Sequence, residues 1–284
     1  VCLVLNILQI GLAQEKTTTG QYSTLKDFQR YTGQKITGFK EAPMLTELVK
    51  QGKLPSVEKR LPEEPAVIVP VERIGEYGGT WKRCWTGVAD SAGPSRINYT
   101  PTLRWSEDGK KIEPNVAKGW NLSKDCKEFT LYFRKGMRWS DGEPFTADDV
   151  LFWFEDVILN KELTPVQPTW MMLGGSTKIE KLDSYTVKFT FSNPNPLILQ
   201  WFTGVEAFLP KHYLKSFHPK YVSKTDLEAL TKKEGFQFWY QLFGAKNDWI
   251  SNPERPTHKA WKPNNLPSST LWIMERNPYY WKVD

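Results

Sequence analysis

Cysteine is scarce in this sequence. Three cysteines in 284 residues are too few for a fold held together by disulfides. Cys84 and Cys126 have neither a Cys-x-x-Cys spacing nor paired histidines beside them, so the sequence predicts no metal site. The net charge is +6, but the basic residues are scattered among acidic ones, which argues against a nucleic-acid binder. The sequence also lacks an apolar run of about 20 residues, the length that a transmembrane helix needs.

Signatures of catalysis are missing as well. The sequence contains no Gly-x-Ser-x-Gly, His-Glu-x-x-His or Gly-x-x-x-x-Gly-Lys-Ser/Thr segment. His212, His218 and His258 do not have the spacing of metal ligands. Glu155 and Asp156 are adjacent on an expected helix and do not face each other, unlike the paired carboxylates of a glycosidase. We therefore expect no enzyme, no metal and no cofactor, with a secreted carbohydrate-active enzyme or carbohydrate-binding protein as the alternative.

Aromatic residues, in contrast, are abundant. They make up 14% of the chain and include 13 tryptophans, which excludes a generally disordered protein. The length is enough for about two domains. Phe129, Leu131 and Phe133 alternate with polar residues, which predicts a half-buried strand. Residues 179–191 predict a hairpin that turns at Asp183-Ser184.

Helix signals lie between these strand patterns. Thr146 is a good N-cap, and Asp149 follows three residues later in a capping-box arrangement. A shorter helix is predicted over residues 42–50, with a proline in its first turn. Three prolines predict that residues 61–70 run extended over the surface. Residues 78–81 are expected to open a strand. This mixture of strands and helices predicts an α/β chain.

The first 13 residues carry no charge. They are interpreted as the remnant of a signal peptide cleaved after Ala13, with a buried strand or helix as the alternative. Cys2 opens the apolar run, whereas a lipidated cysteine would close it, so no lipid anchor is expected. Export into an oxidising compartment would permit a bridge between Cys84 and Cys126, but we expect buried free thiols, with the bridge as the alternative.

Residues 113–160 contain a long and specific motif. Its positions are Pro114, Ala117, Trp120, Arg134, Lys135, Gly136, Trp139, Asp141, Gly142, Pro144, Phe145, Thr146, Ala147, Asp149 and Val150. This region resembles the signature of the extracytoplasmic solute-binding proteins of ABC importers, in the oligopeptide/dipeptide/nickel-binding family (family 5). Shorter resemblances follow at residues 182–187, 209–212 and 276–281. The sequence departs from the family pattern at residues 124–127 and 256–261, and the second segment lies near the cleft in relatives.

The resemblance implies an α/β, two-lobed, periplasmic-binding-protein-like fold, truncated before the second lobe. It divides the chain into a signal-peptide remnant at 1–13, an N-terminal extension at 14–70, an incomplete first lobe at 71–95 and 190–284, and a small inserted domain at 96–189. The implied protein is a monomeric, periplasmic receptor exported through a signal peptide. It would capture an oligopeptide or oligosaccharide and deliver it to the permease subunits of an ABC importer, with no nucleic-acid partner.

Ligand contacts are expected from aromatic loop residues, because such rings stack on sugar faces or fill side-chain pockets. Trp120, Trp139 and Trp153 belong to the signature and are expected in the core. Residues 85–87 follow the expected first strand, where relatives open toward the cleft, and residues 258–261 lie in the departing segment. The candidate ligand-binding residues are Trp85, Thr86, Tyr99, Trp170, His258 and Trp261.

Overall fold

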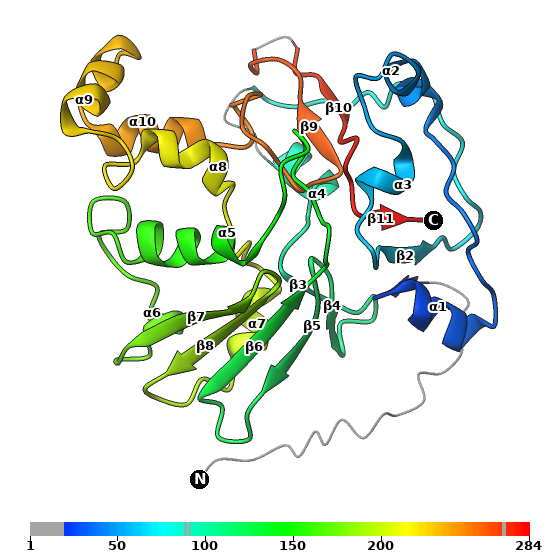
Figure 1. Ribbon diagram of the computed structural model, residues 1–284, viewed down its shortest axis with the longest axis horizontal. Helices are drawn as coiled ribbons and strands as arrows, with labels where there is room; N and C mark the ends of the chain where they lie inside the picture. Colours follow the sequence, from blue (N-terminus) through cyan, green and yellow to red (C-terminus); the bar gives the residue numbers. More distant parts are fainter. Residues whose placement is uncertain (1–19, 88–89, 91, 269–270) are drawn as a thin grey trace.

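The computed structural model describes residues 20–87, 90, 92–268 and 271–284; the predicted signal-peptide remnant at 1–13 lies outside them. Figure 1 shows a large sheet at the bottom of the view, a helical group at the upper left, and a small sheet on the right. The strands are β1 (Gly20–Tyr22), β2 (Ala66–Val69), β3 (Leu103–Trp105), β4 (Ile112–Pro114), β5 (Ala117–Leu122), β6 (Glu128–Phe133), β7 (Thr177–Asp183), β8 (Thr186–Phe191), β9 (Trp261–Pro263), β10 (Met274–Arg276) and β11 (Lys282–Val283).

The helices are short. They are α1 (Leu25–Thr32), α2 (Thr46–Lys50), α3 (Val57–Arg60), α4 (Ala92–Ile97), α5 (Ala147–Leu151), α6 (Thr169–Met172), α7 (Ile198–Phe202), α8 (Lys211–Leu214), α9 (Lys224–Lys233) and α10 (Trp239–Asn247), with 3₁₀ turns at Pro43–Leu45 and Lys215–Phe217 and a π-helical segment at Phe152–Ile158. The helix predicted over residues 42–50 is confirmed as the first of these 3₁₀ turns followed by α2. Within the described ranges, no helix is both long and apolar enough to cross a lipid bilayer.

The largest sheet has the order β5-β6-β8-β7, and each neighbouring pair is antiparallel. Phe129, Leu131 and Phe133 of β6 are fully buried, together with Val187 and Phe189 of β8. They belong to one apolar core with residues of α5 and the π-helical segment. The predicted strand and the predicted hairpin are therefore confirmed, with the hairpin turn between β7 and β8. Trp139 and Trp153 are buried and Trp120 packs against the same core, as expected.

The predicted N-cap of α5 is confirmed. The Thr146 backbone N–H donates to Oδ2 of Asp149 at 2.9 Å, and Thr146 Oγ1 accepts from the backbone N–H of Asp148 at 3.3 Å. Asp149 also accepts from Trp139 Nε1 at 3.2 Å and from the backbone N–H of Lys211 at 3.0 Å. Burial raises the pKa of Asp149 to about 6 against the effect of these donors. The carboxylate therefore joins three segments of the fold, which is a structural role.

The prolines near residues 61–70 bracket a strand. β2 is the central strand of a three-stranded sheet, antiparallel to β1 and parallel to β11. Ala66 and Val67 are almost completely buried, so the predicted surface course is wrong for this strand. Pro65 and Pro70 lie just outside the strand, where the missing N–H groups do not interrupt its pairing.

Arg134 of the signature connects this small sheet to the large one. Its guanidinium is fully buried and donates to the backbone carbonyls of Asn115 at 2.8 Å and Glu64 at 2.9 Å, and to that of Ser23. It also lies 4.8 Å from the ring centroid of Trp281. Burial lowers the pKa of Arg134 to about 9, so the group stays protonated at neutral pH. The buried guanidinium of Arg134 thus contacts residues near the beginning and the end of the described chain, Ser23 and Trp281.

The strand expected to open at residues 78–81 is not formed. Between Val69 and Leu103, the described residues include no strand, and Ile74 and Trp81 are 60% and 70% exposed. A strand needs a neighbour to pair its backbone groups, and no strand of the described part of the chain pairs with this segment. The expectation of buried thiols is also wrong for Cys84, which is exposed; no disulfide joins it to Cys126.

Candidate ligand-binding site

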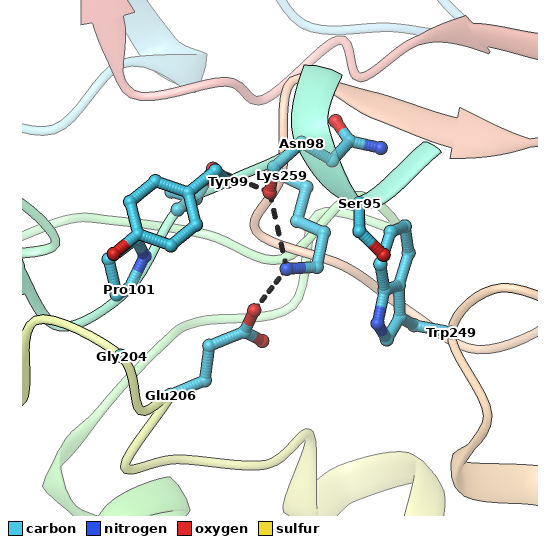
Figure 2. A pocket seen from close by; sticks show the side chains of 9 residues that line it. Ser95, Asn98, Tyr99, Pro101, Gly204, Glu206, Trp249 and Lys259 are labelled. Atoms are coloured by element: carbon cyan, nitrogen blue, oxygen red, sulfur yellow. Dashed lines mark hydrogen bonds and ion pairs between the residues drawn. The ribbon is translucent and has the colours of Figure 1, made fainter. Parts of the chain in front are cut away.

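A pocket of about 170 Å³ lies where four segments of the chain meet (Figure 2). Ser95 of α4 and residues 98–101 form one side, Gly204 and Glu206 come from the loop between α7 and α8, and Trp249 and Lys259 come from the stretch between α10 and β9. The volume is smaller than the roughly 300–1,000 Å³ of a typical pocket for a whole small-molecule ligand. It suits one unit of a larger molecule.

An ion pair between a buried lysine and a partly exposed glutamate lies at the centre of this pocket. The ammonium of Lys259, which is 2% exposed, donates to Oε1 of Glu206 and lies 3.4 Å from the carbonyl oxygen of Asn98. It also lies 4.5 Å from the ring centroid of Trp249. Burial lowers the pKa of Lys259, although Glu206 opposes this shift. Burial alone would raise the pKa of Glu206, but Lys259, His258 and Arg255 together outweigh it, and the net shift is downward, which favours the carboxylate.

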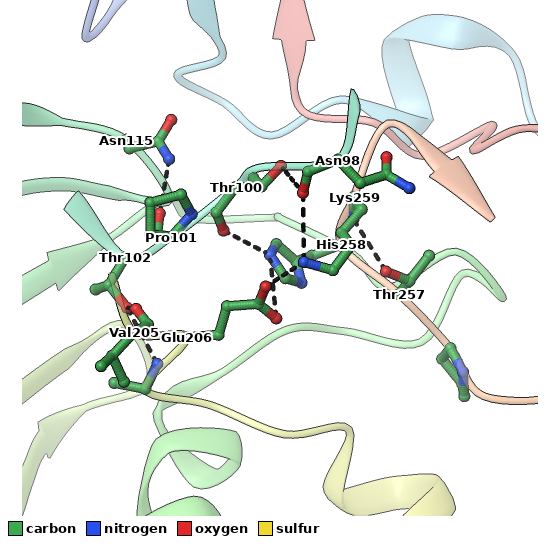
Figure 3. Close-up of polar contacts among 12 residues, drawn as sticks. Asn98, Thr100, Pro101, Thr102, Asn115, Val205, Glu206, Thr257, His258 and Lys259 are labelled. Atoms are coloured by element: carbon green, nitrogen blue, oxygen red, sulfur yellow. Dashed lines mark hydrogen bonds and ion pairs between the residues drawn. The ribbon is translucent and has the colours of Figure 1, made fainter. Parts of the chain in front are cut away.

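Two more basic side chains, His258 (Figure 3) and Arg255, lie close enough to Glu206 to affect its charge. His258 is 1% exposed, and its Nε2 lies 3.0 Å from the carbonyl oxygen of Thr100 and 4.0 Å from Oε2 of Glu206. Burial lowers the pKa of His258 to about 4, so the ring is neutral at physiological pH and donates to Thr100. Arg255 is 5% exposed, and burial lowers its pKa to about 10, which leaves it charged.

Hydrogen bonds between distant segments fix the walls of the pocket. The side-chain amide of Asn98 donates to the carbonyl oxygen of Trp261 at 2.9 Å and accepts from the backbone N–H of Trp261 at 3.0 Å, which joins β9 to the end of α4. The Thr102 N–H donates to the carbonyl oxygen of Val205 at 3.0 Å, which holds the Glu206 loop against the start of β3. Both contacts join segments more than a hundred residues apart in sequence.

Three of the six sequence candidates gather around this pocket. Tyr99 lines it, is 60% exposed, and donates its hydroxyl to the carbonyl oxygen of Thr203. His258 lies behind the ion pair rather than in the lining, and Trp261, 37% exposed, begins the strand that Asn98 holds.

The other three candidates lie in different surroundings. Trp85 stacks on Trp272 with the ring centroids 5.8 Å apart, and the neighbouring Thr86 is exposed and bonds to Asp90. Trp170 stacks on Trp201 at 5.6 Å, where α6 meets α7. None of Trp85, Thr86 and Trp170 is among the described residues that line the pocket.

Sequence reasoning missed the charged pair and Trp249. Lys259 lies inside the segment that departs from the family pattern, so a search for unusual residues there would have found it. Glu206 has no comparable signal, because it is a single acid before an apolar run. The described residues contain no group of three or more His, Cys, Asp or Glu placed to hold a metal.

Comparison with known proteins agrees with this architecture. Residues 111–284 match the model of the "Bacterial extracellular solute-binding proteins, family 5 Middle". The periplasmic alpha-galactoside-binding protein of Rhizobium meliloti (strain 1021) is 31% identical over 96% of this chain and 40% of its own length. The chain thus spans about 40% of that curated relative.

Two solved structures extend the agreement to the fold. A protein described as oligopeptide-binding protein OppA is 43% identical, with a TM-score of 0.89 over 93% of this chain and 42% of its own. The periplasmic binding protein MelB of Agrobacterium fabrum C58, solved with stachyose, is 31% identical, with a TM-score of 0.71 over 88% of this chain and 39% of its own. The predicted α/β, periplasmic-binding-protein-like fold is confirmed, and these relatives are binding proteins rather than enzymes. The chain belongs to the bacterial extracellular solute-binding proteins of family 5.

Proposed function

We propose that this protein is the receptor of an ABC importer, which captures an oligomeric solute outside the cytoplasm and delivers it to membrane permease subunits. The observation that carries the proposal is the family match over residues 111–284. The proposed protein is periplasmic and monomeric, is exported through a signal peptide, and has neither a lipid anchor nor a nucleic-acid partner. The division into an N-terminal extension, an incomplete first lobe and an inserted domain at 96–189 is part of the same proposal.

Two ligand classes have support from named relatives. An oligopeptide is favoured by the 43% identity to the structure described as an oligopeptide-binding protein. An oligosaccharide is favoured by two relatives at 31% identity, one named for alpha-galactosides and one solved with stachyose. Both classes are chains of repeated units, and a pocket of about 170 Å³ has room for one unit of either.

The ligand-binding residues proposed are those that the sequence identified, together with the pair that the fold adds. Tyr99 has the strongest support, because it is exposed and lines the pocket beside Glu206 and Lys259. Trp261 is supported by its exposure and its bond to Asn98. His258, Trp85, Thr86 and Trp170 complete the proposed set.

Calorimetric titration of the protein expressed from its complete reading frame tests this function. The panel contains oligopeptides of two to five residues and neutral oligosaccharides of matched length, and each mixture is then analysed for products. Stoichiometric binding of one class without turnover is expected. Hydrolysis of an oligosaccharide would instead support the alternative, a carbohydrate-active enzyme. Absence of binding to every member of the panel would contradict the proposal for both ligand classes.

A further inference from the structure

The pocket around Lys259 is polar, yet its lining carries no net charge. Among the described residues that line it, only Glu206 and Lys259 are charged, and they already neutralise each other. The charge of Arg255, which is not among the described lining residues, interacts with the carboxylates of both Glu206 and Asp248. A ligand that enters this pocket therefore meets hydrogen-bonding groups, but the negative charge of Glu206 is already balanced by the positive charge of Lys259.

This arrangement disfavours a charged group of the ligand. A peptide ammonium would approach Glu206 but would also meet the ammonium of Lys259. A peptide carboxylate would approach Lys259 but would also meet Glu206. Either charge would lose water without gaining an unshared partner, which is costly in a partly enclosed site. The pocket is therefore selective for uncharged groups.

Glu206 keeps hydrogen-bonding capacity toward the pocket. Its side chain is 30% exposed, Oε1 accepts from Lys259, and Oε2 lies 4.0 Å from His258 Nε2, beyond hydrogen-bonding distance. A carboxylate has about four lone-pair positions, so several can accept from a ligand. Two neighbouring hydroxyl groups can donate to one carboxylate together, whereas a peptide unit has a single N–H.

Two aromatic rings flank the ion pair. Figure 2 shows Tyr99 on one side of Lys259 and Glu206, and Trp249 on the other. Tyr99 is 60% exposed, so its ring is available for contact. Such rings pack well against the flat C–H faces of a pyranose, while the hydroxyl groups at the edge of the sugar reach polar partners.

From this geometry we infer that the pocket is a subsite for one uncharged, hydroxyl-rich unit of the ligand, a hexose of an oligosaccharide, with Glu206 as the acceptor and Tyr99 and Trp249 as the walls. The inference rests on the proposed receptor function and narrows its ligand class. Lys259 is a positioning residue in this arrangement, because it holds the Glu206 carboxylate in place and in its ionised form.

The test uses the protein expressed from its complete reading frame and three variants. The paired variant Glu206→Gln/Lys259→Met removes both charges together, so that no buried ammonium remains without a partner. Tyr99→Ala removes one wall. Tyr132→Ala is the matched control, because it removes an exposed tyrosine of β6 that does not line the pocket. Thermal denaturation of each variant checks that it is folded.

Calorimetry with a neutral tetrasaccharide of hexoses, free peptides and end-capped peptides gives the affinities. We expect the tetrasaccharide to bind and the peptides not to bind. The paired variant should weaken sugar binding about tenfold, the difference between a charged and a neutral acceptor. Tyr99→Ala should weaken it by about fivefold or more, and Tyr132→Ala by less than about twofold, as expected away from an interface.

Three results would overturn the inference, and they differ in what they say about the receptor. Tight binding of peptides without binding of sugar would leave the receptor function intact and reject the sugar subsite. Sugar binding that is unchanged in both pocket variants would place the ligand elsewhere on the receptor. Absence of binding to every probe would reject the subsite and the proposed function together.

Discussion

Replacing His258 with glutamine should make the folded protein less sensitive to acid. In the wild-type protein this ring is buried, and its pKa falls from 6.5 to about 4 because burial disfavours the charged form. When the pH falls, the unfolded chain therefore takes up a proton before the folded protein does. Stability attributable to His258 is complete above about pH 6.5 and is lost as the pH falls toward 4.

The size of the effect follows from these two pKa values. Between about pH 7 and about pH 4.5, proton uptake by the unfolded state costs roughly 2.5 kcal/mol of stability. Glutamine does not titrate, and its amide can still donate to the carbonyl of Thr100, which His258 contacts at 3.0 Å. The variant should thus start at a lower stability at pH 7, because the ring no longer packs against Phe208 at 4.7 Å, but should lose less on acidification.

The difference between the two proteins is the informative quantity, because other groups titrate in the same range. Burial raises the pKa of Asp149 from 3.8 to about 6, so the folded state takes up this proton first. The contribution of Asp149 therefore increases as the pH falls from 6 toward 4, opposite to that of His258. Both proteins keep Asp149, and its effect cancels in the comparison.

Urea denaturation of both proteins at several pH values provides the assay, with each free energy of unfolding extrapolated to water. NMR titration of the His258 ring gives its pKa independently. If the wild-type protein and the variant lose the same free energy on acidification, or if the ring titrates near 6.5, then His258 is not buried as neutral imidazole and the reasoning is refuted.

The helix cap, the tryptophans and the length of the chain each lead to a further expectation. Thr146→Ala should lower the free energy of unfolding by about 1 kcal/mol with little effect on ligand affinity, as urea denaturation and calorimetry can check. Trp261→Ala should weaken ligand binding, whereas Trp120→Ala, which removes a ring packed on the core, should cost about 3 kcal/mol of stability; unchanged affinity in the first variant removes Trp261 from the site. The 284 residues span 40% of the length of one curated relative, and a receptor of the proposed kind encloses its ligand between two lobes. Expressed alone, these residues should therefore bind the ligand weakly, and a submicromolar affinity in titration would contradict this.

Local patterns in the sequence were sufficient to predict β6, the β7–β8 hairpin and helix α5. The alternation in β6 specifies which face is buried, and the cap at Thr146 depends on residues three positions apart. Such signals are read within one element and need no knowledge of the rest of the fold.

The sequence-based predictions were wrong where a strand depends on pairing with segments that are distant in the sequence. β2 is buried because β1 and β11 pair with it, and β11 lies more than two hundred residues away. Residues 78–81 have a strand-like sequence, but no described strand lies beside them to complete the pairing. The strand propensity of the residues predicts neither the burial of β2 nor the absence of a strand at residues 78–81, because a strand is stabilised by the strands beside it.

The sequence indicated some of the exposed aromatic residues of the candidate site, but it did not indicate the ion pair between Glu206 and Lys259. Tyr99 could be proposed because a loop aromatic is often a contact residue. The rule that lysine and glutamate remain at the surface, however, gives no reason to place Lys259 and Glu206 in a pocket. The two residues are 53 positions apart, and hydrogen bonds of the Asn98 side chain and the Thr102 backbone bring their segments together. A buried ammonium that a single carboxylate neutralises is a costly choice for stability alone, since well-packed apolar residues would serve as well. Its position beside two aromatic rings makes ligand recognition the better explanation, and the paired variant distinguishes these roles, because a purely structural pair would change the melting temperature and leave sugar affinity unaltered.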